Sequence, residues 1–223
     1  MLKVEQLFKR FGSKVIVDRV SFEVDSAITV IVGLNGSGKS TLLKVMAGIW
    51  PQDGGSVFIG DRNITRFAPE DRHVGYVPQH AALFKTMTVK ENIRYCLRNG
   101  RGSEEMVERL IEMLELGEVL HQKADTLSGG FQSRVSMARA LASNPQVMLL
   151  DEPLSDLDVA IKEKLLPQFK KVLKALHMPV VYVTHDSMEA GLMGDRFSVM
   201  VRGTLSEVNS AQHAFDVVRS NVG

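Results

Sequence analysis

The sequence predicts an α/β fold, with a mostly parallel sheet covered by helices, an antiparallel β flank and an inserted helical subdomain. Strand and helix signals alternate from end to end of the 223 residues. Residues 147–150 and 180–184 are unbroken apolar runs, typical of parallel strands buried on both faces, and long helical segments separate them. The hydrophobic content of 44% is sufficient for a core, and no repeat or low-complexity linker divides the chain. We therefore expect a single domain over residues 1–223.

The first third of the chain carries the signals of short strands, which we expect at 2–7, 20–24, 28–32, 57–59 and 74–77. The first two and the fourth are expected to form the antiparallel flank. From residue 88 to about 117 the pattern changes, because apolar residues such as Met106, Leu110 and Met113 recur at helical spacing among Glu and Arg. This change predicts a helical subdomain over approximately residues 84–140. Later in the chain, Pro167 predicts a kink or a helix restart near Leu165.

The most informative segment is GLNGSGKS at residues 33–40, which fits the phosphate-binding pattern G-x-x-x-x-G-K-[ST] at every required position. The strand expected before it and the helix expected at 41–47 are the context that this motif needs. Backbone N–H groups of the loop would surround the terminal phosphates of a nucleotide, at the positive end of the helix dipole. Lys39 would neutralise phosphate charge, and the Ser40 hydroxyl would bind Mg²⁺. The core is therefore expected to be that of a P-loop NTPase, which leaves a kinase, a GTPase, a helicase and a transport motor open.

Two carboxylates follow the strand at 147–150 directly. Asp151 and Glu152 stand where a central strand leaves the sheet at its carboxyl edge, which is also the edge of the phosphate loop. Asp151 is placed to hold Mg²⁺ through water, and Glu152 to polarise the attacking water as general base. A strand that ends in Asp-Glu is a weak signal alone, and it gains weight beside an intact phosphate loop.

The residues Leu127, Ser128, Gly129 and Gly130 precede a helix that begins near Gln132. Ser128 is expected to cap this helix, and the two glycines leave backbone N–H groups free at its positive end. The segment is either a second phosphate-binding surface or an ordinary capping turn. Because one nucleotide already has its own loop, a second anion site suggests pairing with another copy of the chain.

Bulk properties narrow the classes of protein only a little. The net charge is +1 and no basic block stands out, so we expect no nucleic acid as partner. Cys96 is the single cysteine, which excludes an internal disulfide and a thiolate metal cluster and fits a reducing compartment. No signal peptide and no apolar run of about 18 residues is found, so another subunit would have to hold the chain at a membrane.

In their order and amino-acid sequence, these segments resemble the ATPase subunit of an ATP-binding cassette (ABC) transporter over nearly the whole chain. Residues 33–40 resemble the Walker A loop and 147–152 the Walker B strand. The other matches are Gln79 in the Q-loop, the signature at 127–130, the D-loop at 155–158 and the switch histidine, His185. Phe11 matches the aromatic residue that stacks on adenine, with an ordinary core Phe as the alternative.

The resemblance implies a head-to-tail homodimer that encloses two ATP molecules. In one copy the ATP-binding residues would be Phe11, Gly33, Leu34, Asn35, Gly36, Ser37, Gly38, Lys39, Ser40 and Thr41. The other copy would add Leu127, Ser128, Gly129, Gly130 and Asp158. Catalysis is assigned to Glu152, His185 and Gln79, and the Mg²⁺ ligands to Ser40, Gln79 and Asp151. Hydrolysis of ATP would remove the phosphate contacts between the copies and open the dimer.

Two positions depart from the family pattern. Phe131 occupies the fifth signature position, where Gln is usual, and Gln132 follows it. Because the backbone donors and Ser128 remain, we expect activity to be retained. Asp156 replaces a small residue in the D-loop and adds a carboxylate near the expected dimer interface.

The segments at 82–93 and 151–158 look like those of importers for oxyanions, polyamines and sugars. An uptake system for molybdate, tungstate or sulfate is favoured, in part because the chain ends soon after Gly203 and leaves no room for a regulatory domain. The alternatives are an importer for a polyamine, sugar or amino acid, a soluble cassette ATPase in translation or DNA repair, and a P-loop kinase. The expected partners are membrane permease subunits and, indirectly, a solute-binding protein, with the chain peripheral on the cytoplasmic side of the membrane. Residues 83–93 are expected to receive a permease helix, with Phe84 and Met87 either as exposed apolar contacts or as ordinary core residues.

Overall fold

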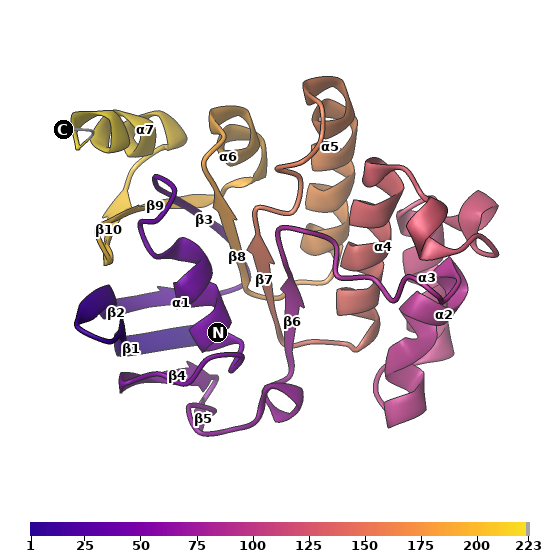
Figure 1. Ribbon diagram of the computed structural model, residues 1–223, viewed down its shortest axis with the longest axis horizontal. Coiled ribbons are helices and arrows are strands. Elements are labelled where there is room, and N and C mark those ends of the chain that lie inside the picture. Colours follow the sequence, from indigo (N-terminus) through magenta and orange to yellow (C-terminus); the bar gives the residue numbers. More distant parts are fainter. Residues whose placement is uncertain (222–223) are drawn as a thin grey trace.

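The computed structural model describes residues 1–221, which form two sheets and a set of covering helices (Figure 1). The antiparallel sheet has the order β2-β1-β4-β5, and its strands are β1 Leu2–Phe11, β2 Lys14–Val24, β4 Gly54–Ile59 and β5 Arg62–Asn63. The larger sheet has the order β10-β9-β3-β8-β7-β6. Its strands are β3 Ile28–Val32, β6 Val74–Val77, β7 Val147–Asp151, β8 Val180–Thr184, β9 Arg196–Val201 and β10 Thr204–Val208. Strand β10 pairs with β9 antiparallel, whereas the other pairs of this sheet are parallel.

The helices of the described chain are α1 Lys39–Met46, α2 Val89–Ile93, α3 Glu104–Met113, α4 Gly129–Ala142, α5 Val159–Ala175, α6 Ser187–Met193 and α7 Ala211–Ser220. Short 3₁₀ turns lie at Pro69–Asp71, Arg94–Asn99, Gly117–Val119 and Ala124–Thr126. Helices α2, α3 and α4 fall between β6 and β7, so this part of the chain is helical as the sequence predicts. None of the helices in residues 1–221 is long and apolar enough to cross a membrane.

Two apolar clusters form the core, one on each face of the larger sheet. Because successive side chains of a strand point to opposite faces, Val147 and Leu149 of β7 pack with the α1 side, and Met148 and Leu150 with the α4 side. Figure 1 accordingly shows α1 and α4 on different sides of β7. The cluster on the α4 side contains sheet residues together with Val107 and others from the helical segment, so the two parts share one core.

The predicted strands at 28–32, 74–77 and 180–184 coincide with β3, β6 and β8, and the antiparallel flank is confirmed. Strands β1 and β2 are longer than predicted, since their outer ends form a hairpin with exposed side chains and lack the apolar pattern of the buried part. Strands β9 and β10 were not predicted.

The prediction of a helix restart near Leu165 is wrong, because α5 continues through Pro167. A proline deprives the carbonyl four residues earlier of its donor, here that of Glu163. Glu163 and Pro167 both lie on the exposed side of α5, where water can satisfy that carbonyl. The helix therefore tolerates the proline.

Candidate active site

The phosphate loop joins the fully buried strand β3 to α1. Its backbone lies so close to neighbouring strands that two of its glycines cannot carry a side chain. A Cβ on Gly33 would lie 2.5 Å from the carbonyl oxygen of Met200 in β9, and one on Gly38 would lie 2.4 Å from that of Ile16 in β2. Gly38 also has a φ of 110°, which side chains rarely adopt. The close packing leaves the backbone N–H groups of the loop at the N-terminus of α1, where a phosphate is bound favourably.

Lys39 lies inside the loop and is only 4% exposed. Its Nζ donates to the carbonyl oxygens of Gly33 at 2.8 Å and Leu34 at 3.0 Å, and lies 3.5 Å from Oε1 of Glu152. Burial lowers the pKa of Lys39, and the charges of Glu152 and Asp151 offset this only in part. A cation held in such surroundings is a strong ligand for an incoming phosphate.

Asp151 ends β7 and is bound by two hydroxyl groups. Ser40 Oγ donates to its Oδ1 at 2.8 Å, and Tyr76 Oη donates to its Oδ2 at 2.9 Å. Burial, followed by the charge of Asp151, raises the pKa of Tyr76, so the phenol keeps its proton and remains a donor. No motif in the sequence indicates Tyr76. In the sheet Tyr76 pairs with Leu149, and Asp151 lies two residues further along β7 on the same face.

Glu152 and His185 are brought together from neighbouring strand ends. Oε2 of Glu152 lies 2.7 Å from Nδ1 of His185, whose side chain is 48% exposed. Glu152 itself is buried and has a φ of 48°, in the left-handed region that residues with side chains seldom occupy. Strained backbone of this kind occurs at functional sites, where the surrounding structure fixes it. Here the N–H of Glu152 donates to the Val183 carbonyl at 3.1 Å.

Of these groups, Lys39, Ser40 and Glu152 face a cavity of about 440 Å³. It is lined by Phe11, Lys14, Ile16, Asn35, Gly36, Gly38, Lys39, Ser40, Thr41, Gln79 and Glu152. Nine of these are predicted site residues, and they come from β1, the phosphate loop with α1, the segment after β6 and the residue after β7. Lys14 and Ile16 were not predicted, because their place at the cavity depends on the hairpin between β1 and β2.

Phe11 stands at the rim of this cavity with 48% of its surface exposed, so the alternative of an ordinary core Phe is wrong. Trp50 contacts its ring edge-on, with centroids 5.2 Å apart, and Lys9 Nζ lies 5.2 Å from its centroid. Asp53 fixes the adjoining backbone by accepting a hydrogen bond from the Arg10 N–H at 2.7 Å. The arrangement presents an aromatic face that a nucleobase can stack on.

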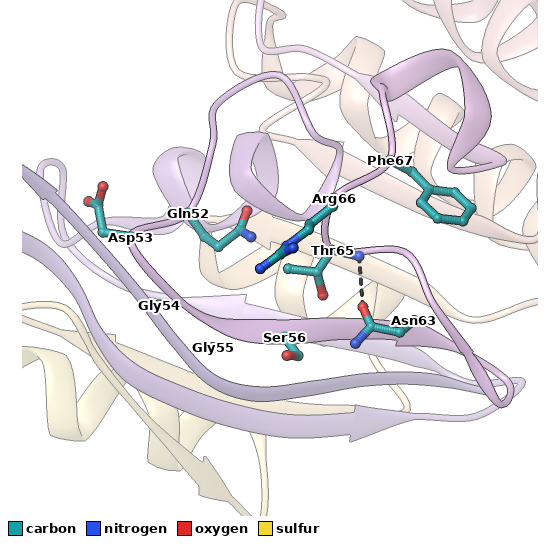
Figure 2. A pocket seen from close by; sticks show the side chains of 9 residues that line it. All are labelled: Gln52, Asp53, Gly54, Gly55, Ser56, Asn63, Thr65, Arg66 and Phe67. Atoms are coloured by element: carbon teal, nitrogen blue, oxygen red, sulfur yellow. Dashed lines mark hydrogen bonds between the residues drawn. The ribbon is translucent and has the colours of Figure 1, made fainter.

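A second hollow, of about 570 Å³, lies on the antiparallel sheet (Figure 2). None of the predicted site residues is among those that line it. Its polar groups serve the fold: Asn63 Oδ1 accepts from the Thr65 N–H at 3.0 Å, and Thr65 Oγ1 accepts from the Val57 N–H at 2.9 Å. Asp53, at the edge of the same hollow, supports the strand that carries Phe11.

The signature segment lies apart from the cavity within one chain. Leu127, Ser128, Gly129, Gly130 and Asp158 are all absent from the cavity wall. Leu127 is buried in the core, whereas Ser128, Gly129 and Asp158 are exposed. Ser128 is the N-cap residue of α4 as predicted, but its side chain makes no capping hydrogen bond. At the start of α4, Ser128 and Gly129 are therefore exposed, whereas Gly130 is buried.

The two departures from the family pattern also have neighbours in the structure. The ring of Phe131 lies 5.2 Å from the Arg134 guanidinium, and it packs against the core on the α4 side. Asp156 Oδ2 lies 2.7 Å from Nδ1 of His80, the residue after Gln79. Both partners of that pair are largely exposed, so the contact contributes little to stability.

Comparison with known proteins decides the family, because the family described as ABC transporter matches residues 17–155. The chain belongs to the ABC transporter family. Its relatives include the molybdate/tungstate import ATP-binding protein WtpC of Methanocaldococcus jannaschii, 42% identical over 212 residues, which are 92% of this chain and 69% of the relative. The sn-glycerol-3-phosphate import ATP-binding protein UgpC of Cereibacter sphaeroides is 39% identical over 220 residues, 96% of this chain and 63% of the relative. The chain therefore spans about two thirds of the length of these relatives.

Solved structures agree with this assignment. An ATP-binding cassette of an ABC transporter in its ADP conformation superposes with a TM-score of 0.84 at 29% identity, covering 98% of this chain and 94% of that one. The chain is thus an ABC ATPase domain with a nucleotide-binding P-loop core. Family membership excludes the P-loop kinase.

Proposed function

We propose that this ABC domain hydrolyses ATP to ADP and phosphate and so powers solute uptake through a separate membrane permease. The observation that supports it best is the set of contacts beside the phosphate loop: Lys39 and Glu152 line one cavity, Ser40 of the same wall binds Asp151, and His185 contacts Glu152. Lys39 is a cation that can bind phosphate, Asp151 is a carboxylate that can bind a metal, and Glu152 is a base that His185 orients. Together they make up the parts of a hydrolytic phosphoryl-transfer site.

The site fits a nucleotide with bound Mg²⁺. Ser37 Oγ is buried in the loop without a hydrogen-bond partner, as expected where a phosphate oxygen supplies one. Ser40 and Asp151 offer oxygen donors 2.8 Å apart, and Gln79 lies on the same cavity wall. Mg²⁺ is usually held by one or two carboxylates together with substrate phosphates, and it would neutralise negative charge on them. We assign its ligands to Ser40, Gln79 and Asp151.

Glu152 acts as general base in this proposal. Its carboxylate is fixed by His185 on one side and Lys39 on the other, and it takes a proton from the attacking water. His185 orients that carboxylate and, with half of its ring exposed, contacts the γ-phosphate. Lys39 transfers its hydrogen bonds from the loop carbonyls to the phosphates when ATP binds. Phe11 supplies the surface for adenine.

The substitution Glu152→Gln tests the assignment of the base. It keeps the size of the side chain and removes its basicity, so we expect ATP binding within about twofold of wild type and a fall in phosphate release of at least roughly 100-fold. The readouts are nucleotide binding by fluorescence and phosphate release at saturating ATP. Glu163→Gln, which neutralises an exposed acid on α5, is the control and should behave as wild type. Near-normal phosphate release from Glu152→Gln would overturn the assignment.

The partners and the location follow from the same proposal. A second copy completes each nucleotide site with Ser128, Gly129 and Gly130 at the start of α4 and Asp158 at the start of α5; of these, Ser128, Gly129 and Asp158 are exposed. The permease holds the dimer at the cytoplasmic face of the membrane, and a solute-binding protein delivers cargo to that permease. The family relatives described above carry importer names, which favours uptake over export.

For the cargo we propose an oxyanion, with molybdate or tungstate first. The support is the importer name of the relative at 42% identity, whereas the relative at 39% has an organic phosphate in its name. Cells that lack this chain should lose uptake of radiolabelled molybdate and regain it when the chain is restored. Unchanged molybdate uptake together with lost uptake of glycerol phosphate would reassign the cargo.

A further inference from the structure

A buried network of charged and polar groups joins the first turn of α5 to β8 and α6, outside the cavity. Lys162 Nζ lies 2.8 Å from Oε1 of Glu189 and 3.1 Å from Oδ2 of Asp186. Glu189 is 1% exposed, and its other oxygen accepts hydrogen bonds from Tyr182 Oη at 2.9 Å and Thr184 Oγ1 at 2.8 Å. Burial acts to lower the pKa of Lys162, but the hydrogen bonds and charges of Glu189 and Asp186 outweigh it and raise that pKa. The ammonium therefore keeps its proton.

The same network fixes the backbone on both sides of His185. On one side, Thr184 Oγ1 accepts a hydrogen bond from the Asp186 N–H at 3.0 Å. On the other, Asp186 is the N-cap of α6, and its Oδ1 accepts from the N–H groups of Met188 at 2.8 Å and Glu189 at 3.2 Å. The imidazole between these anchors reaches Glu152 at 2.7 Å. The position of the His185 imidazole thus depends on groups that do not line the cavity.

Lys162 brings α5 into this arrangement close to the D-loop. Helix α5 has Asp158 as its N-cap residue, and the N–H of Lys162 donates to the Asp158 carbonyl at 3.0 Å. The ammonium of one residue therefore links the turn that follows the D-loop to the loop that carries His185.

A charged network of this kind is not the arrangement that stabilises a core most. Lys162 and Glu189 must be desolvated, and Asp186 in part, whereas apolar side chains of similar volume often stabilise a core as well or better. The charged groups instead fix orientation, since each of their hydrogen bonds holds one particular group in place. The groups that they fix here are the neighbours of the catalytic histidine.

We propose that Lys162 is a positioning residue for His185, which joins the first turn of α5 and the loop of His185 into one unit. This inference rests on the proposed role of His185 in hydrolysis.

The test compares Lys162→Met with Lys162→Arg in steady-state ATP hydrolysis. Lys162→Met should lower kcat by roughly tenfold and leave KM for ATP within about twofold, because the phosphate loop is untouched. Lys162→Arg, which keeps the charge, should restore most of the lost kcat. Lys170→Met is the matched control: its ammonium also lies on α5 and donates to the Leu192 carbonyl at 2.7 Å, but this contact is away from His185, and kcat should not change.

A double-mutant cycle separates positioning from a merely structural role. If Lys162 acts through His185, Lys162→Met should lower kcat no further in a His185→Ala background. An equal fall in both backgrounds would overturn the proposal. Because Lys162→Met leaves the Glu189 charge buried alone, the double variant Lys162→Met with Glu189→Gln is measured as well, with its fold checked by circular dichroism. A folded double variant with wild-type kcat would also overturn it.

The same cycle distinguishes a failure of the proposed role of His185 from a failure of the inference about Lys162. If His185→Ala has wild-type kcat, then the proposed role of His185 is wrong, and the inference about Lys162 falls with it. If His185→Ala lowers kcat and Lys162→Met does not, then only the inference about Lys162 is wrong.

Discussion

At the scale of single residues, the site depends on hydrogen bonds that hold charged groups in one orientation. Asp151 is the clearest case, since a hydroxyl group binds each of its carboxylate oxygens. Ser40 belongs to the phosphate loop and could be expected there from the motif alone. Tyr76 could not, because its contact with Asp151 depends on the register of β6 against β7, between residues that are 75 positions apart.

The substitution Tyr76→Phe isolates that contact. The ring stays in place, and one hydrogen bond to a carboxylate is lost, which costs about 1.5 kcal/mol. We expect the Mg²⁺ concentration for half-maximal ATP hydrolysis to rise roughly tenfold, with little change in kcat at saturating Mg²⁺. The measurement is a Mg²⁺ titration of phosphate release. Tyr95→Phe removes a phenol away from the cavity and should not shift the titration; an unshifted curve for Tyr76→Phe would exclude a role for its hydroxyl in holding Asp151.

At the scale of elements, the strands buried on both faces are predicted correctly. Strands β3, β7 and β8 are short apolar runs with clear ends, so composition alone locates them. Strand β10 is mostly exposed and carries polar residues such as Glu207, so its pairing with β9 has no local signal. The motifs can be located from the sequence for the same reason as the buried strands, because the residues of each motif are contiguous in the chain. The network around Lys162 and Glu189 cannot be located in this way, because it joins elements that are separate in the sequence and meet only in the fold.

The helical segment also forms a groove where an external element can bind. A hollow of about 590 Å³ is lined by Phe84, Tyr95, Cys96 and Arg139, among others. Phe84 is 37% exposed, packs on Tyr95 with centroids 4.5 Å apart, and lies 5.0 Å from the Arg139 guanidinium. Arg139 Nη1 is buried without a partner. Of the two apolar contacts predicted for a permease helix, Phe84 is exposed and Met87 is only half-buried.

We predict that Phe84→Glu uncouples transport from hydrolysis. A carboxylate in this groove disfavours an apolar helix, while the phosphate loop and Glu152 are unaffected. Solute uptake in proteoliposomes with the permease should fall at least about tenfold, and ATPase activity of the isolated chain should stay within about twofold. Arg109→Glu, on the exposed side of α3, is the control and should transport normally. Normal uptake with Phe84→Glu would show that the permease binds elsewhere.

At the scale of the whole molecule, the phosphate loop and the signature segment lie on different sides of β7. The phosphate loop precedes α1, which packs with Leu149, whereas the signature segment begins α4, which packs with Leu150. Neither Ser128 nor Gly129 lines the nucleotide cavity. Under the proposed function, a nucleotide bound to the loop of one copy would meet the start of α4 only in a second copy.

We predict that ATP drives dimer formation through this surface. In Glu152→Gln, which cannot turn over, added ATP should double the molar mass measured by light scattering, because the γ-phosphate bridges the two copies. Adding Ser128→Arg places a bulky side chain at the first turn of α4, so the double variant should remain a monomer while it binds ATP through its intact loop. Ser206→Arg, on the exposed edge strand β10, changes size and charge equally and should leave the dimer intact. A dimer that forms equally well with Ser128→Arg would mean that the copies meet through some other surface, and that the start of α4 is an ordinary helix end.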